Sequence, residues 1–190
     1  MKTRSIMIVG VGGQGSLLAS RIIGNVLLSQ GFDVKVSEVH GMSQRGGSVV
    51  TYVKYGSEVC SPVVEKGEAD IISFEQLEAA RYVSYLKKGG HIITSTQQID
   101  PMPVITGAAV YPEDIIGKLK AEGVDVIAVD ALALAEQAGT AKASNVVLMG
   151  VVSTKMAFDE DVWQKALENC VPAKFLELNK KAFALGREVK

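Results

Sequence analysis

A glycine-rich turn near the start of the chain could bind an anion. It matches the G-x-G-x-x-G pattern, follows a β-branched run and precedes apolar residues at helical spacing. In this setting glycines permit a tight turn and a close approach of phosphate to the backbone. Free N–H groups and the positive end of the helix dipole then favour an anion. The pattern predicts phosphate or pyrophosphate binding, the alternative being a tight turn that binds nothing, and the residues concerned are Gly10, Gly12, Gly13, Gln14 and Gly15.

An acidic residue further along raises NAD as one possible ligand. A dinucleotide site needs a carboxylate near the end of the second strand, roughly 20 residues beyond the glycines, to accept from the ribose. Glu38 stands 23 positions beyond Gly15 and nearly qualifies. A dehydrogenase domain would continue into another crossover helix, whereas this chain enters a polar loop over residues 39–48.

This second loop holds further binding candidates. Its glycines and hydrogen-bonding side chains make it costly to order without a partner. Arg45 could clamp a phosphate or carboxylate through two parallel hydrogen bonds, although a solvated loop arginine would look the same in sequence. The candidate binding residues of the loop are Ser43, Gln44, Arg45, Gly46 and Gly47.

Two histidines complete the set of groups that could do chemistry. His40 is a candidate general base because its unperturbed pKa lies near neutrality; a hydrogen-bonded structural histidine is the alternative. His91 follows Gly89 and Gly90 at the start of a predicted strand and is interpreted as structural. No other residue is assigned a catalytic role.

Composition restricts the classes of protein. The 190 residues are 47% hydrophobic, with 20 basic and 21 acidic side chains, so the formal charge of −1 gives no basic excess for nucleic acid or an anionic membrane. The longest apolar run, residues 146–152, is too short to span a bilayer. Cys60 and Cys170 are too few for an iron–sulfur cluster or a structural zinc site, and they favour a cytoplasmic location.

The order of predicted elements indicates an α/β domain. Strands are expected at residues 5–10, 34–38, 48–55, 69–74, 91–95 and 124–129, with helices after the first, fourth and fifth of these. Two consecutive strands without a helix between them, at 34–38 and 48–55, predict an antiparallel insertion. Pro101, Pro103 and Pro112 interrupt the middle of the chain, where residues 104–106 and 107–111 are expected to form short or edge strands before a helix at 113–121.

The C-terminal third is predicted to be helical. Helices are expected at residues 131–138, 144–156, 159–169 and 174–187, with Asp159 capping the third. Together these elements predict a Rossmann-like open, mostly parallel sheet with helices on both faces. We expect a single domain over residues 1–190, large enough to bury roughly 70% of its unfolded surface.

Three stretches carry a family resemblance: Gly10 to Gly15, Glu38 to Ser48, and Phe74 to Arg81. Tyr111-Pro112, Asn145 to Gly150 and Asn179 to Phe183 add support. Through these residues the chain resembles the gamma-type domain of the thiamine-dependent 2-oxoacid:ferredoxin oxidoreductases. Within that family it is most similar to the beta subunits of the indolepyruvate-specific enzymes, and the match spans nearly the whole chain.

The resemblance implies a subunit that is inactive alone. In that family a larger partner holds thiamine diphosphate, Mg²⁺ and iron–sulfur clusters. The complex converts an arylpyruvate and coenzyme A to an acyl-CoA, carbon dioxide and reduced ferredoxin. The chain itself has neither the cysteines for electron transfer nor a Gly-Asp-Gly stretch with a following Asn to hold thiamine diphosphate through a metal. The resemblance further implies that this domain helps to enclose the coenzyme A site, where the glycine turn and Arg45 could contact the phosphates.

Two other classes of function compete with this interpretation. One is a free-standing NAD(P)- or FAD-binding Rossmann-like oxidoreductase, and the other is a small nucleotide-binding regulatory module without an enzyme partner. The 2-oxoacid preferred by the complex depends largely on the partner's pocket, so the sequence alone does not determine it.

Overall fold

The computed structural model describes residues 3–41 and 46–189, and its centre is a mixed β-sheet. Within the described residues the strand order is β2-β3-β1-β4-β5-β6. The strands are β1 (Arg4–Val11), β2 (Asp33–His40), β3 (Ser48–Gly56), β4 (Ala69–Ser73), β5 (His91–Ser95) and β6 (Asp125–Val129). The predicted α/β sheet is therefore confirmed.

Strand β3 is the antiparallel insertion. It lies between β1 and β2 and is antiparallel to both, while β1, β4, β5 and β6 run parallel to one another. The full-length pairing of β1 with β3 begins at Arg4 opposite Tyr55 and ends at Val11 opposite Ser48. As a result, the loop before β3 reaches the same edge of the sheet as the turn after β1.

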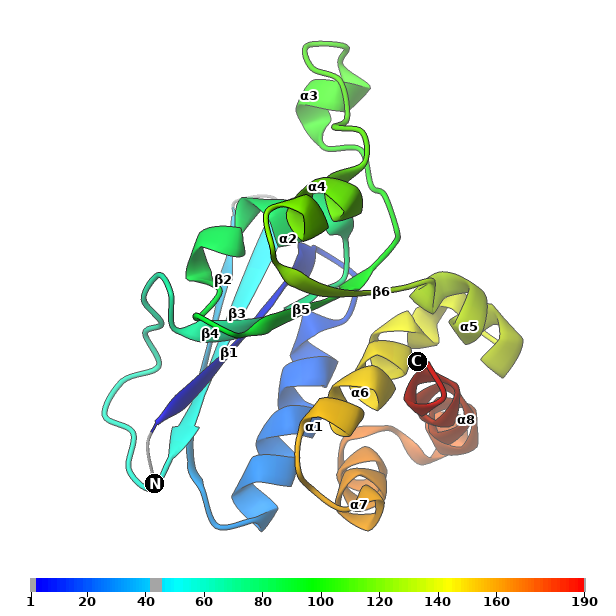
Figure 1. Cartoon of the computed structure of the whole chain (residues 1–190). Coiled ribbons are helices and arrows are strands. Elements are labelled where there is room, and N and C mark those ends of the chain that lie inside the picture. Colours follow the sequence, from blue (N-terminus) through cyan, green and yellow to red (C-terminus); the bar gives the residue numbers. More distant parts are fainter. Residues whose placement is uncertain (1–2, 42–45, 190) are drawn as a thin grey trace.

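Helices cover both faces of the sheet (Figure 1). On one face, α1 (Ser16–Ser29) and α6 (Ser144–Lys155) pack against the strands, and α5 (Ala131–Ala138), α7 (Glu160–Cys170) and α8 (Leu176–Arg187) pack around these two helices. The other face packs against α2 (Gln76–Arg81) and α4 (Ile115–Ala121). Short 3-10 turns lie at Val83–Tyr85, Ala141–Ala143 and Ala173–Phe175. None of the helices in the described ranges is long and apolar enough to cross a membrane.

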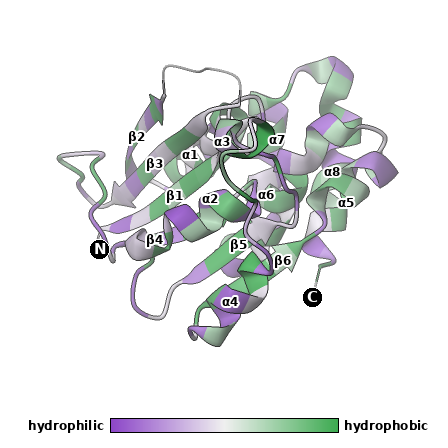
Figure 2. Ribbon diagram, turned by 90° about the horizontal axis from the view of Figure 1, so that it is seen from above, coloured by the Kyte–Doolittle hydropathy of each residue, from purple (hydrophilic) through white to green (hydrophobic). Residues whose placement is uncertain are grey.

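The central strand shows why its sequence forms this layer. Ile6 and Ile8 point into the core on the α1 side, while Met7 and Val9 point into the core on the α2 side, and all four are almost fully buried. A strand buried on both faces needs a continuous apolar run rather than an alternating one. Figure 2 shows hydrophobic colour along β1, in the middle of the sheet.

The proline-rich segment differs from its prediction. The strands expected at residues 104–106 and 107–111 are wrong: Met102–Ile105 forms the short helix α3, and the following residues are irregular. Proline lacks the N–H that a strand would donate, but it fits the first turn of a helix, where that group has no partner. Pro101 occupies the N-cap position of α3 and Pro103 lies in its first turn.

Several helix ends also shift from the prediction. The helix after β4, expected to run up to Gly89 and Gly90, ends at Arg81 and is followed by the 3-10 turn Val83–Tyr85. Helix α4 begins at Ile115 rather than at residue 113. Asp159 is at the N-cap position of α7 as expected, but its side chain makes no capping hydrogen bond. These changes do not alter the layers.

Helices α6 and α8 pack with their backbones almost in contact. A methyl group added at Gly150 would overlap the carbonyl oxygen of Phe183 and would lie 2.9 Å from the Cα of Gly186. Because the neighbouring atoms belong to the backbone, they cannot move aside as a flexible side chain could.

We therefore expect Gly150→Ala to lower the free energy of unfolding by about 2 to 3 kcal/mol. The matched control is Gly24→Ala in α1, where an added methyl group meets nothing within 4 Å. The control should raise stability by up to about 1 kcal/mol, because alanine favours the helix. Urea unfolding measures both, and a gain in stability for Gly150→Ala would contradict the close packing.

Candidate functional site

The glycine turn joins β1 to α1 in a conformation that requires glycine at two positions. Gly13 and Gly15 have φ angles of 101° and 87°, which side-chain-bearing residues rarely adopt. Gly15 is also the N-cap of α1, and a side chain there would overlap the Asn145 amide, which donates to the Gly15 carbonyl at 3.2 Å. The turn is thus fixed by its own backbone and by α6.

A shallow pocket lies beside this turn. Its volume is about 380 Å³, and it opens toward strands β2 and β3. The lining residues are Gly12, Gly13, Gly15, Ser16, Leu17, Glu38, His40 and Val49. The structure therefore brings Gly12, Gly13 and Gly15 together with His40 and Glu38, whereas Gly10 lies within β1 and does not line the pocket.

Part of the turn's backbone is free to bind a ligand. The Gly12 N–H donates to the Gly47 carbonyl at 2.9 Å, and the Gln14 N–H donates to the Val11 carbonyl at 3.2 Å. Four other amides of the turn and the first turn of α1 donate to no acceptor in the described part of the chain: Gly13, Gly15, Ser16 and Leu17. This arrangement can hold an anion at the start of α1.

Gln14 points away from the pocket. Its side-chain oxygen accepts from the Val11 N–H at 2.7 Å, and its amide nitrogen donates to the Phe74 carbonyl at 2.9 Å and to the Gln97 side chain at 3.0 Å. These bonds join the ends of β1 and β4, between which an open α/β sheet usually binds its ligand. The carboxamide of Gln14 is therefore used inside the protein, and the pocket lies on the other side of the turn.

Glu38 brings negative charge into the pocket. Its carboxylate accepts from the Ser16 hydroxyl at 3.1 Å and the Thr51 hydroxyl at 2.8 Å, and it lies 3.4 Å from Nε2 of His40. A phosphate at the start of α1 would be repelled by this carboxylate unless a nearby cation compensates it.

The predicted binding residues of the second loop are only partly described. Ser43, Gln44 and Arg45 lie outside the described residues. Gly46 is exposed with a φ angle of 76°, and Gly47 receives the N–H of Gly12. This hydrogen bond brings the ends of the two glycine-containing loops together.

The sheet order counts against the NAD interpretation. In a dinucleotide-binding fold the second strand is next to the first, so its terminal carboxylate faces the glycine turn across that junction. Here β3 separates β1 from β2, and two hydroxyl groups already donate to Glu38.

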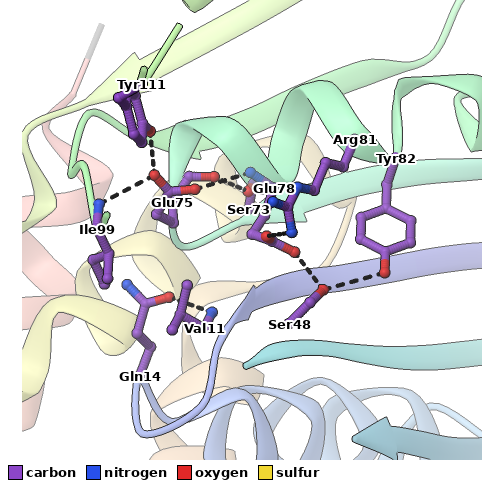
Figure 3. Close-up of polar contacts among 10 residues, drawn as sticks. All are labelled: Val11, Gln14, Ser48, Ser73, Glu75, Glu78, Arg81, Tyr82, Ile99 and Tyr111. Atoms are coloured by element: carbon purple, nitrogen blue, oxygen red, sulfur yellow. Dashed lines mark hydrogen bonds and ion pairs between the residues drawn. The ribbon is translucent and has the colours of Figure 1, made fainter. Parts of the chain in front are cut away.

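The sequence analysis missed a buried polar network at the same edge of the sheet (Figure 3). Glu75, 1% exposed, is the N-cap of α2 and accepts from the Glu78 N–H at 2.9 Å. Its other oxygen accepts from the Ile99 N–H at 3.2 Å and from the Tyr111 hydroxyl. One buried carboxylate therefore binds two segments that are far apart in sequence.

Glu78 extends this network to the first residue of β3. Its carboxylate accepts from the Ser48 hydroxyl and from Arg81, the latter at 3.0 Å, and the Ser48 oxygen lies 3.2 Å from the Tyr82 hydroxyl. Burial raises the pKa of Glu78, and the hydrogen bond from Ser48 partly opposes this shift. In the sequence, this network could have been suspected from Glu75 and Glu78, which lie three residues apart directly after a predicted buried strand.

Among residues 3–41 and 46–189, no three His, Cys, Asp or Glu side chains are grouped so that they could hold a metal ion. The two cysteines are free thiols on different parts of the surface, with Cys60 exposed and Cys170 half-buried.

The family assignment follows from sequence and fold together. Residues 5–189 match the model of the pyruvate ferredoxin/flavodoxin oxidoreductase family, so the chain belongs to this family. The chain is accordingly a subunit of a 2-oxoacid:ferredoxin oxidoreductase. The resemblance predicted from the sequence is confirmed.

Similar proteins include subunits of indolepyruvate enzymes. The indolepyruvate oxidoreductase subunit IorB of Thermococcus kodakarensis is 44% identical, with 98% of this chain and 95% of that protein aligned. The IorB subunit of Archaeoglobus fulgidus is 40% identical, with 96% of this chain and 92% of that protein aligned.

Solved structures share the fold at lower identity. The pyruvate oxidoreductase subunit PORC of Thermotoga maritima matches with a TM-score of 0.75 and 18% identity, over 100% of this chain and 97% of that chain. The 2-oxoglutarate:ferredoxin oxidoreductase of Magnetococcus marinus, solved with 2-oxoglutarate, coenzyme A and succinyl-CoA bound, gives the same TM-score and identity. There this chain covers only 31% of a longer polypeptide.

The raised pKa of Glu78 gives a testable pH dependence. A carboxyl group whose pKa is higher in the folded state than its usual 4.5 destabilises the protein as it ionises. The stability of the wild type relative to Glu78→Gln should therefore fall as the pH rises through and above 4.5. Urea unfolding at several pH values measures this difference.

Glu68 provides the control of opposite sign. Its pKa is lowered, first by the Glu65 backbone N–H and then by Lys54. The stability of the wild type relative to Glu68→Gln should therefore fall as the pH drops below 4.5. If the stability of the wild type relative to Glu78→Gln instead rose with pH, the Glu78 carboxylate would be stabilised by its neighbours, and the prediction for Glu78 would be wrong.

Proposed function

We propose that this chain is the beta-type subunit of an indolepyruvate:ferredoxin oxidoreductase, inactive alone. The observation that carries the proposal is the 44% identity to an indolepyruvate oxidoreductase subunit over 98% of this chain. With a larger subunit that holds thiamine diphosphate, Mg²⁺ and iron–sulfur clusters, it would convert an arylpyruvate and coenzyme A to acyl-CoA and carbon dioxide. Two electrons would pass to ferredoxin. Residues 1–190 would act as one gamma-type domain.

The contribution of this chain would be to bind coenzyme A. The thiamine cofactor, held elsewhere, supplies the decarboxylation chemistry. Coenzyme A carries a pyrophosphate and a 3′-phosphate, and the chain offers unpaired amides at the start of a 14-residue helix beside a pocket of about 380 Å³. The coenzyme A bound in the Magnetococcus structure makes this ligand chemically reasonable for the family.

The carboxylate of Glu38 requires a cation in the proposed phosphate site. Because Glu38 lies in the same pocket, its negative carboxylate would repel a phosphate that is bound by the amides alone. A cation must compensate, and Arg45 belongs to the loop whose end is bonded to the glycine turn through Gly12 and Gly47. His40 would contribute when protonated. We therefore assign the main phosphate contact to Arg45, and we expect the amides to position the phosphate.

We expect Arg45→Ala, in the assembled complex, to raise the KM for coenzyme A about 10-fold or more, because a charge-assisted hydrogen bond is lost. The KM for the 2-oxoacid should stay the same. Arg21→Ala is the matched control, since Arg21 is exposed on α1 beside Cys170 rather than in the pocket. Steady-state assays of ferredoxin or viologen reduction with indolepyruvate give both constants.

Dephospho-coenzyme A separates the two phosphate groups. If Arg45 binds the 3′-phosphate, the effect of Arg45→Ala disappears with this substrate; if it binds the pyrophosphate, the effect persists. An unchanged KM for both forms of the substrate would remove Arg45 from the coenzyme A site.

A further inference from the structure

A projecting segment, residues 98–112, has no role in the pocket and is here named the arm. Figure 1 shows it rising from the body of the molecule, with α3 near its tip. Its exposed apolar side chains include Met102 (64% exposed), Ile105 (65%) and Val110 (86%). Such a group of large apolar side chains in water is a feature of protein-binding surfaces.

The arm carries no formal charge along its outer part. Residues 101–110 contain no acidic or basic side chain, although 22% of the whole chain is charged; Asp100 and Glu113 lie at the base of the arm. A solvated loop of this length would ordinarily carry charged groups. The surface that fits it is therefore an uncharged, apolar groove.

The arm is folded before any partner binds. Its tip is closed by backbone bonds, including Ile105 N–H to the Pro101 carbonyl at 3.1 Å and Ala109 N–H to the Pro103 carbonyl at 3.0 Å. Such preorganisation lowers the entropic cost of docking.

Both ends of the arm are held at one buried group. The Ile99 N–H and the Tyr111 hydroxyl donate to the same oxygen of Glu75, whose other oxygen accepts from the start of α2. Burial and the neighbouring Glu75 raise the pKa of Tyr111, so its hydroxyl stays protonated and remains a donor. The arm is therefore a rigid projection rather than a trailing loop.

Its position indicates which protein it meets. The arm leaves the edge of the sheet at which β1, β4 and β5 end, which is also the edge of the glycine turn (Figure 1). Under the proposed function, the companion subunit approaches this edge to close over coenzyme A. A ketoisovalerate oxidoreductase subunit of Methanothermobacter marburgensis is 25% identical, and this chain covers only 36% of its length. In that relative, the part that matches this chain is therefore joined covalently to further protein.

We propose that the arm inserts into an apolar groove of the companion subunit and anchors this chain to it. This inference rests on the proposed function for the identity of the companion. A second copy of the chain is the competing occupant.

The test compares two triple variants of the full chain for binding to the purified companion subunit. Met102→Ser, Ile105→Ser and Val110→Ser together should weaken binding about 100-fold, because an apolar anchor in a groove dominates the affinity. The matched control replaces Leu28, Val63 and Phe175 by serine; these side chains are 60%, 60% and 48% exposed at other places. It should bind like the wild type. Thermal unfolding verifies that both variants are folded.

Replacing residues 101–110 by a short Gly-Ser linker gives an independent variant and should weaken binding at least as much. Equal binding by the wild type and either arm variant would overturn the proposal. So would an arm variant that dissociates a homodimer while keeping its affinity for the companion, since the occupant would then be a second copy. Failure of the wild type itself to bind the companion would overturn the proposed function and, with it, the identity of the occupant.

Discussion

The insertion of an antiparallel strand between β1 and β2 is the constraint on which the rest of the structure depends. Because β3 runs back beside β1, the loop that precedes it ends next to the turn that follows β1. The hydrogen bond from Gly12 to Gly47 is the direct result. With a helical crossover in place of β3, β2 would lie next to β1 and the loop that ends at Gly47 would not meet the glycine turn.

This constraint also moves the site from its usual place in such sheets. Open α/β sheets bind ligands between the ends of the two strands where the chain order reverses, here β1 and β4. The side chain of Gln14 occupies that position and bonds to Phe74 and Gln97. The pocket therefore lies on the other side of the turn, beside Glu38 and His40. A buried network centred on Glu75 and Glu78 then fixes the neighbouring segments, so that one edge of the sheet carries the pocket, the loop before β3 and the arm.

The sequence predicted the local features well. The β-branched runs gave the strands, the apolar spacing gave α1, and the missing helix before residue 48 gave the antiparallel insertion. These signals are short-range, since each depends on neighbours within one element. The prediction for the proline-rich segment was wrong because proline is compatible both with an edge strand and with the first turn of a helix, and the sequence does not distinguish these two structures.

The contacts that define the site depend on residues far apart in the chain. Gln14 was expected to bind the ligand, yet its partner Phe74 is 60 positions away, and that contact follows from the sheet order rather than from a motif. The role of Glu75 could not be predicted from the sequence for the same reason, because its partner Tyr111 lies 36 positions further along the chain. The family could be recognised from three stretches spread along the chain, because each stretch is a local pattern and needs no knowledge of which residues meet in the fold.

A crystal structure of the assembled complex with coenzyme A would show directly where the phosphates bind. We expect a phosphate of coenzyme A within hydrogen-bonding distance of the amides at the start of α1, on the side of Glu38 and His40, with Gln14 still bonded to Phe74. A phosphate between the ends of β1 and β4, with the Gln14 side chain displaced, would contradict it, as would coenzyme A that touches no residue of this chain.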